Sequence, residues 1–137
     1  MIRAQLVLAD FAETDPSGKV HLLGGGWTVT RGGSPHAVVV FLKVPADQAG
    51  KPITVTLRLV TKQGRAVVEQ LGPGGMQRLE ITAQVVSGEL PDWDQSVDLD
   101  AVFAVNLGPL LLQAGTYTWV AEIDGKEATA TDFIARA

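Results

Sequence analysis

The segment Ile53-Thr54-Val55-Thr56-Leu57-Arg58-Leu59 alternates apolar and polar side chains without interruption. Successive side chains of a β-strand point to opposite faces, so this segment has one apolar and one polar face. The segment Leu79-Glu80-Ile81-Thr82-Ala83-Gln84-Val85 repeats the pattern. In an amphipathic helix the apolar residues would recur every three or four positions. Both segments therefore predict strands that are buried on one face and solvated on the other.

Similar patterns, separated by turn residues, continue along the chain and predict nine strands. They lie near residues 2–11, 19–29, 36–44, 52–61, 65–70, 77–86, 98–106, 116–123 and 127–134. Turns are expected at 15–18, at the glycine-rich 72–75, and at Asp124-Gly125, which suits a two-residue type I′ hairpin. Residues 44–50 have room for one helical turn at most. We predict an all-β, antiparallel two-sheet β-sandwich of eight or nine strands, immunoglobulin-like or jelly-roll, with a closed β-barrel as the alternative.

Length and composition narrow the class of protein. The 137 residues match one domain spanning residues 1–137, and the absence of cysteine excludes disulfides and thiolate chemistry. The start of the chain lacks the basic region and long apolar stretch of a secretory signal, and no run of about 18 apolar residues follows. We therefore expect a cytoplasmic protein without a membrane partner. The net charge of −4 and the scattered basic residues argue against nucleic acid as a partner.

Two segments are apolar on both faces, which is typical of strands covered from both sides. They are Ala37-Val38-Val39-Val40-Phe41-Leu42 and Ala101-Val102-Phe103-Ala104-Val105. A simple two-layer sandwich covers only one face of each sheet, so the other face needs a further partner. The apolar segment 107–115 or a second copy of the chain would supply that cover. The sequence thus predicts either a folded-over loop or a homodimer.

A set of motifs resembles an uncharacterised family of small bacterial single-domain β proteins. The set comprises the start Arg3–Asp10, the segment Gly24-Gly25-Gly26-Trp27, and an ending formed by Asn106-Leu107-Gly108-Pro109, Gly115-Thr116-Tyr117-Thr118-Trp119 and Ile123-Asp124-Gly125. The resemblance covers most of the chain. It implies a β fold and a bacterial origin, and it implies no activity.

The acidic stretch around Trp93 is the main candidate site. Asp92 and Asp94 flank Trp93, and tryptophan anchors recur in protein interfaces. Calcium takes six to eight oxygen ligands, which makes four nearby carboxylates weak metal candidates: Asp92, Asp94, Asp98 and Asp100. The glycine that the twelve-residue calcium loop requires is missing, so we assign no metal. A carbohydrate- or calcium-dependent ligand-binding module that uses residues 92–100 is the alternative function.

Tyr117 and Trp119 lie two positions apart and share a strand face with Ala121 and Ile123. The apolar neighbours favour a buried strand, in which the tyrosine hydroxyl bonds to nearby backbone, over an aromatic platform for a ligand. The glycines at 24–26 have no helix after them and so form no phosphate loop. We expect a bend there that lets a bulky side chain, such as Trp27 or Trp119, cross bare backbone.

The chain offers little catalytic chemistry. His21 and His36 are its only histidines, neither belongs to a zinc-binding motif, and no Gly-x-Ser-x-Gly segment occurs. We therefore predict no catalytic residue and no cofactor. The sequence indicates a non-enzymatic protein-interaction or assembly module of a bacterial or phage protein, whose partner is another protein or a second copy of the chain.

Overall fold

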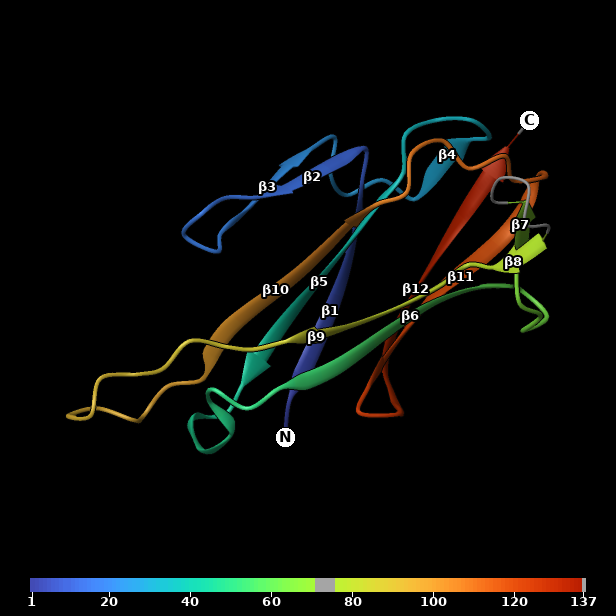
Figure 1. The fold of residues 1–137 in the computed structure, drawn as a ribbon. Coiled ribbons are helices and arrows are strands. Elements are labelled where there is room, and N and C mark those ends of the chain that lie inside the picture. Colours follow the sequence, from blue (N-terminus) through green and yellow to red (C-terminus); the bar gives the residue numbers. More distant parts are fainter. Residues whose placement is uncertain (71–75, 137) are drawn as a thin grey trace.

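The computed structural model describes residues 1–70 and 76–136 and is all-β (Figure 1). The loop predicted at 72–75 lies outside the described residues. The strands are β1 (Arg3–Ala9), β2 (Phe11–Thr14), β3 (Val20–Leu23), β4 (Val29–Arg31), β5 (Ala37–Val44), β6 (Ile53–Thr61), β7 (Val68–Gln70), β8 (Met76–Arg78), β9 (Glu80–Val85), β10 (Leu99–Asn106), β11 (Gly115–Ile123) and β12 (Lys126–Arg136). A single 3₁₀ turn, Ala46–Gln48, occupies the place where one helical turn was predicted. Among the described residues, no helix is long and apolar enough to cross a membrane.

Two larger sheets make up the body of the fold. One has the order β1-β5-β10 and the other has the order β4-β12-β11-β6-β9, and two small hairpins, β2-β3 and β7-β8, are added to them. The pairings are antiparallel except that of β4 with β12, which is parallel, so the prediction of an antiparallel fold is wrong at this pair. In the described residues, each of these strand orders begins and ends with an edge strand. The two sheets therefore differ from the closed barrel that was considered as the alternative.

The two larger sheets share one apolar core. The alternating residues of β6, Ile53, Val55, Leu57 and Leu59, are all buried, as the sequence predicted. They meet the inward residues of β5, such as Val38 and Val40, in a single cluster that also contains Trp119, whose exposed fraction is 0%. Burial of a large aromatic side chain at the centre makes this cluster a dominant source of stability.

Three predicted strands are split in the structure. The segment 2–11 ends at Asp10, whose backbone N–H donates to the carbonyls of Leu23 and Gly24 at 3.0 and 3.3 Å. The segment 19–29 breaks because Gly24 and Gly26 take φ angles of +61° and +87°, outside the β region. The segment 77–86 divides into β8 and β9. In contrast, Asp124 and Gly125 have φ angles of 49° and 85°, which confirms the type I′ turn.

The β2-β3 hairpin covers part of the outer face of the three-stranded sheet. Ala12 and Leu22 of the hairpin pack with Ala37 and Val39 of β5 in a second apolar cluster. The Asn106 side chain fastens the hairpin to β10, because it accepts from the Ala12 N–H at 2.9 Å and donates to the Ala12 carbonyl at 2.6 Å. This hairpin, rather than the segment 107–115, is the cover that β5 requires.

The segment 107–115 has a different position from the one considered in the sequence analysis. Its Leu110 is buried in the core between the two larger sheets, and Leu107 and Leu112 pack against the same core. The alternative in which this segment covers the outer sheet face is therefore wrong. Its apolar residues close one end of the main core instead.

Candidate functional site

The connection between β9 and β10 presents Trp93 to solvent. In Figure 1 this loop extends away from the body of the fold. The Trp93 side chain is 84% exposed, the largest exposure of any aromatic residue among those described. Local hydrogen bonds hold the tip: the Asp94 N–H donates to the Pro91 carbonyl at 3.1 Å, and Gln95 Nε2 donates to the same carbonyl at 2.9 Å. The loop therefore holds a large apolar side chain outward by local backbone contacts.

The surroundings of Trp93 are acidic. Asp92 and Asp94 are exposed on either side of it. Hydrogen bonds from the Ser96 hydroxyl and backbone N–H hold the pKa of Asp94 below its ordinary value, so this carboxylate stays charged at neutral pH. The sequence contains no lysine or arginine between Arg78 and Lys126. The tip thus combines an exposed indole with uncompensated negative charge.

The four carboxylates considered for calcium do not converge. Asp98 forms an ion pair with Arg3 at 3.3 Å, and Asp100 forms one with Lys43 at 2.5 Å. Both pairs tie the acidic side chains to the body of the fold rather than to the tip. Within residues 1–70 and 76–136, no three histidine or acidic side chains are grouped so as to hold a metal ion. The geometry therefore gives no support to a calcium-dependent site here.

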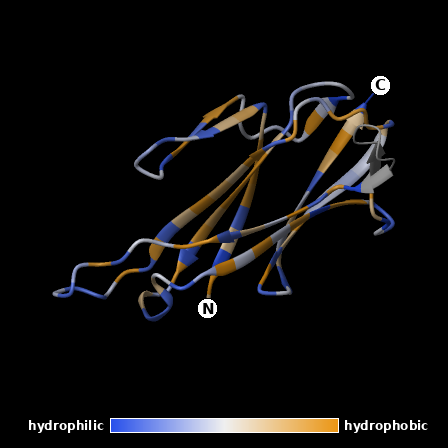
Figure 2. Ribbon diagram, in the orientation of Figure 1, coloured by the Kyte–Doolittle hydropathy of each residue, from blue (hydrophilic) through white to orange (hydrophobic). Residues whose placement is uncertain are grey.

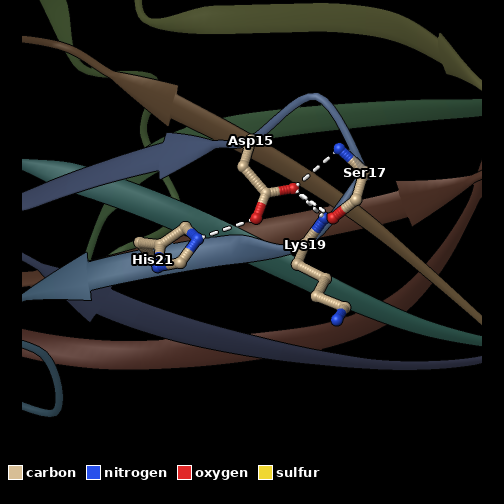
Figure 3. Close-up of polar contacts among 4 residues, drawn as sticks. All are labelled: Asp15, Ser17, Lys19 and His21. Carbon is tan, nitrogen blue, oxygen red and sulfur yellow. Dashed lines mark hydrogen bonds and ion pairs between the residues drawn. The ribbon is translucent and has the colours of Figure 1, made fainter.

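A polar cluster that the sequence analysis missed lies at the tip of the β2-β3 hairpin (Figure 3). Asp15 accepts hydrogen bonds from the Ser17 hydroxyl at 2.5 Å and from the Ser17 and Lys19 backbone N–H groups, and His21 Nε2 lies 2.8 Å from its other oxygen. The Ser17 hydroxyl, followed by His21, holds the pKa of Asp15 well below its usual range. The Asp-Pro-Ser-Gly turn signalled this local arrangement, because aspartate at a turn commonly caps the backbone two residues on.

This cluster has the wrong order for nucleophilic catalysis. In a serine triad the histidine stands between the hydroxyl and the carboxylate. Figure 3 shows Asp15 between Ser17 and His21 instead, so the hydroxyl donates to the carboxylate rather than to the imidazole. The cluster therefore stabilises the hairpin turn.

The second histidine is buried in the core. His36 Nε2 accepts a hydrogen bond from the Trp119 indole N–H at 2.8 Å, and its ring packs edge-on against Trp27 and Phe133. Burial lowers the pKa of His36 to about 4, so its imidazole is neutral at pH 7. No pattern in the sequence indicated that His36 and Trp119, 83 residues apart, would meet.

Tyr117 and Trp119 are core residues, as predicted from their alternation. Tyr117 is 8% exposed, and its hydroxyl donates to the Gln113 carbonyl at 2.7 Å. The Tyr117 ring stacks on Phe133 at a centroid distance of 5.6 Å. Neither ring is available as a platform for a sugar or peptide.

The glycine-rich segment 24–26 lines a shallow cleft of about 550 Å³ together with Asp10, Trp27 and Arg31. The atoms closest to a side chain built at Gly24 belong to the Asp10 carboxylate. The expectation that a tryptophan crosses this backbone is therefore wrong, because an aspartate does so. Gly24 is required by its positive φ angle and by the close approach of Asp10.

Comparison with known proteins identifies a family but no activity. The model of DUF6941, a family of unknown function, matches residues 5–136. No curated protein sequence matches the chain. Among solved structures, the chain is similar to the Pseudomonas fluorescens alkylpurine DNA glycosylase AlkC bound to DNA containing an abasic site analog, with a TM-score of 0.53 and 12% identity. The alignment covers 99% of this chain and 30% of the glycosylase chain, and at this identity it shows the fold alone.

Proposed function

The chain belongs to the DUF6941 family, whose function is unknown, and from its geometry we propose that it is a non-enzymatic protein-interaction module whose contact surface is the Trp93 loop. The observation that carries the proposal is the 84% exposure of Trp93 at the end of a hydrogen-bonded loop. Exposing an indole to water opposes the hydrophobic effect, and buried tryptophans are among the strongest anchors of protein interfaces.

The charge around Trp93 indicates the chemistry of the partner. Asp92 and Asp94 flank the indole, and the 47 residues from 79 to 125 contain no basic side chain. A partner surface with arginine or lysine would pair with these carboxylates and place a cation on the indole face. Electrostatic complementarity of this kind speeds association and weakens with added salt. We therefore propose a basic protein surface as the partner.

The arrangement of the strands supports a β-sandwich of the immunoglobulin type over a jelly roll. The three-stranded sheet, β1-β5-β10, follows the immunoglobulin strand order. Four strands of the five-stranded sheet, β12-β11-β6-β9, follow it as well. Tyr117 near the start of β11 bonds through its hydroxyl to the backbone four residues upstream, as in the tyrosine corner of that fold. Sandwiches of this type present loops at their ends, where the Trp93 loop lies.

Two further arguments support a binding role rather than catalysis or nucleic-acid recognition. His21 is exposed at a hairpin tip, and His36 is buried and bonded to Trp119, so neither histidine adjoins a nucleophile. The glycosylase named above is bound to DNA, but this chain has a net charge of −4 and an acidic loop. Phosphate recognition depends on clustered cations.

The absence of cysteine supports a reducing compartment such as the cytoplasm.

The test compares three forms of the chain as baits in cell extract: wild type, Trp93→Ala, and Leu23→Ala as a control that removes another exposed apolar side chain. We expect a protein that wild type and Leu23→Ala retain and Trp93→Ala loses. The purified partner should then bind Trp93→Ala at least tenfold more weakly by calorimetry, with an affinity that falls as salt is raised.

Two results would contradict the proposal. One is a set of captured proteins that is the same for all three baits. The other is a salt-sensitive shift of duplex or single-stranded DNA by the wild-type chain in a gel assay, which would favour nucleic acid instead.

A further inference from the structure

Strand β10 is an edge strand with an unusual composition. It is the last strand of the sheet β1-β5-β10, so one side of its backbone has no strand partner among the described residues. Its residues 101–105 are Ala-Val-Phe-Ala-Val, and all five are only partly buried. Figure 2 shows hydrophobic colour over most of its length. The hairpin β2-β3 contacts β10 at Asn106, and Val102 and Ala104 of β10 pack against the second apolar cluster, to which the hairpin belongs.

The other edges carry the features that protect a sheet from pairing with another chain. Natural edge strands are protected by charged or polar side chains, prolines, bulges or short length. β9 exposes Glu80, Thr82 and Gln84, and β4 is only three residues long. β1 exposes Arg3 and Gln5. Between Ala101 and Val105, β10 has none of these features, and its register with β5 runs from Leu99 to Asn106 without a shift.

The backbone pattern shows which residues of β10 face the open edge. The Leu107 N–H donates to the His36 carbonyl at 2.9 Å, in register with the pairing of β10 and β5. Backbone groups of an antiparallel strand point alternately to its two sides. Phe103 and Val105 therefore turn their backbone groups toward β5, whereas Val102 and Ala104 turn theirs toward the open edge.

We propose that a second copy of the chain pairs with β10 in antiparallel fashion, which joins the two three-stranded sheets into one continuous sheet about a two-fold axis at Phe103. In this register Val102 lies opposite the partner's Ala104, and Asp100 lies opposite the partner's Asn106. The backbone groups at the open edge would form about eight new hydrogen bonds. Both faces of the joined strands remain apolar in the centre.

The charges of β10 favour a second copy as the occupant. Asp100 is the single charged residue of the strand and lies near one end, and the uncharged Asn106 ends the other. Antiparallel pairing about Phe103 keeps the two Asp100 carboxylates at opposite ends, where each also has Lys43 at 2.5 Å. Closed two-fold dimers are the commonest form of self-association, and they use one surface patch twice. The pairing is independent of the Trp93 loop.

The first test measures mass in solution by light scattering and sedimentation at micromolar concentrations. Wild type should have twice the 14.5 kDa chain mass. Val102→Lys places a charge at the open edge and should yield monomers, with dimer dissociation raised at least tenfold. Val7→Lys is the matched control, because Val7 is also partly buried on the outer face of an edge strand of this sheet, and it should remain dimeric. Trp93→Ala should also remain dimeric.

The second test determines which residues of the two β10 strands lie opposite each other. The chain has no cysteine, so a single introduced thiol reports contact between copies. Phe103→Cys should form a disulfide-linked dimer under mild oxidation, because residues directly opposite on antiparallel strands lie within disulfide range. Leu99→Cys, four positions away on the same face, should not.

A wild-type chain that stays monomeric throughout the micromolar range would overturn the proposal. Equal loss of dimer in Val102→Lys and Val7→Lys would also overturn it. If Phe103→Cys fails to fold, the two lysine variants still decide the question.

Discussion

The Trp119 indole N–H donates a hydrogen bond of 2.8 Å to His36 Nε2 in the centre of the protein. His36 is 2% exposed and Trp119 is 0% exposed, so the bond is shielded from water. It joins the residue just before β5, in the three-stranded sheet, to β11 in the five-stranded sheet. This polar contact therefore ties the two layers together inside a mostly apolar core, where an unpaired donor or acceptor costs free energy.

Trp119→Ala should lower the free energy of unfolding by about 3–5 kcal/mol, because it removes the largest buried side chain and leaves His36 without its donor. Urea unfolding followed by circular dichroism measures the change. Trp93→Ala, at the exposed loop tip, is the control and should change stability by less than about 0.5 kcal/mol. An unchanged midpoint for Trp119→Ala would contradict the assignment of Trp119 to the core.

Stability should fall as pH drops from 6.5 to 4, because His36 is neutral in the folded protein and becomes protonated on unfolding. Its pKa is lowered by burial from 6.5 to about 4, so the unfolded chain binds a proton first. The stabilisation is complete above pH 6.5, and about 3 kcal/mol of it is lost on approaching pH 4.

Urea unfolding at several pH values measures this slope. His36→Gln should reduce it, because glutamine does not titrate. Equal pH profiles for His36→Gln and the wild type would contradict the buried, neutral state of His36.

Tyr117→Phe should cost about 0.5–1.5 kcal/mol, because it removes only the hydrogen bond to the Gln113 carbonyl and keeps the stacking on Phe133. Tyr117→Ala should cost considerably more, since it also removes the buried ring. Thermal and urea unfolding of both variants separates the two contributions. If the two variants lost the same stability, the ring would contribute nothing to packing.

Gly24→Ala should be more destabilising than Gly18→Ala. Both glycines have positive φ angles, +61° and +86°, which cost a non-glycine residue about 1 kcal/mol. A methyl group at Gly18 meets nothing within 4 Å, but at Gly24 it meets the Asp10 carboxylate. Adding Asp10→Ala to Gly24→Ala should restore part of the loss. A thermal midpoint for Gly24→Ala at or above that of Gly18→Ala would refute the close contact.

Metal removal should leave the protein unchanged. Asp98 and Asp100 are engaged by Arg3 and Lys43, and the tip carboxylates do not group with them. Thermal unfolding with EDTA, with calcium and with neither should therefore give the same midpoint. A ligand that binds only the folded state raises the midpoint, so a calcium-dependent rise would revive the site at Asp92, Asp94, Asp98 and Asp100.

Local sequence patterns were sufficient to predict most of the strands and one turn. Alternation in β6 identified its buried face residue by residue, and Asp124-Gly125 gave the hairpin turn, because both depend on backbone geometry within a few residues. The same rule placed Tyr117 and Trp119 in the core. It failed at Asp10 and Gly24, where the chain turns because the two segments contact one another.

The sequence by itself determined that this chain is all-β, which strand faces are buried, and that Trp93 lies in an acidic loop. Tertiary structure alone decided that His36 meets Trp119, that the β2-β3 hairpin covers β5, and that β10 is left at an edge. The physical reason is the range of the interactions. Alternation and turn preferences act between neighbours in the chain, whereas strand order depends on how distant segments share one core.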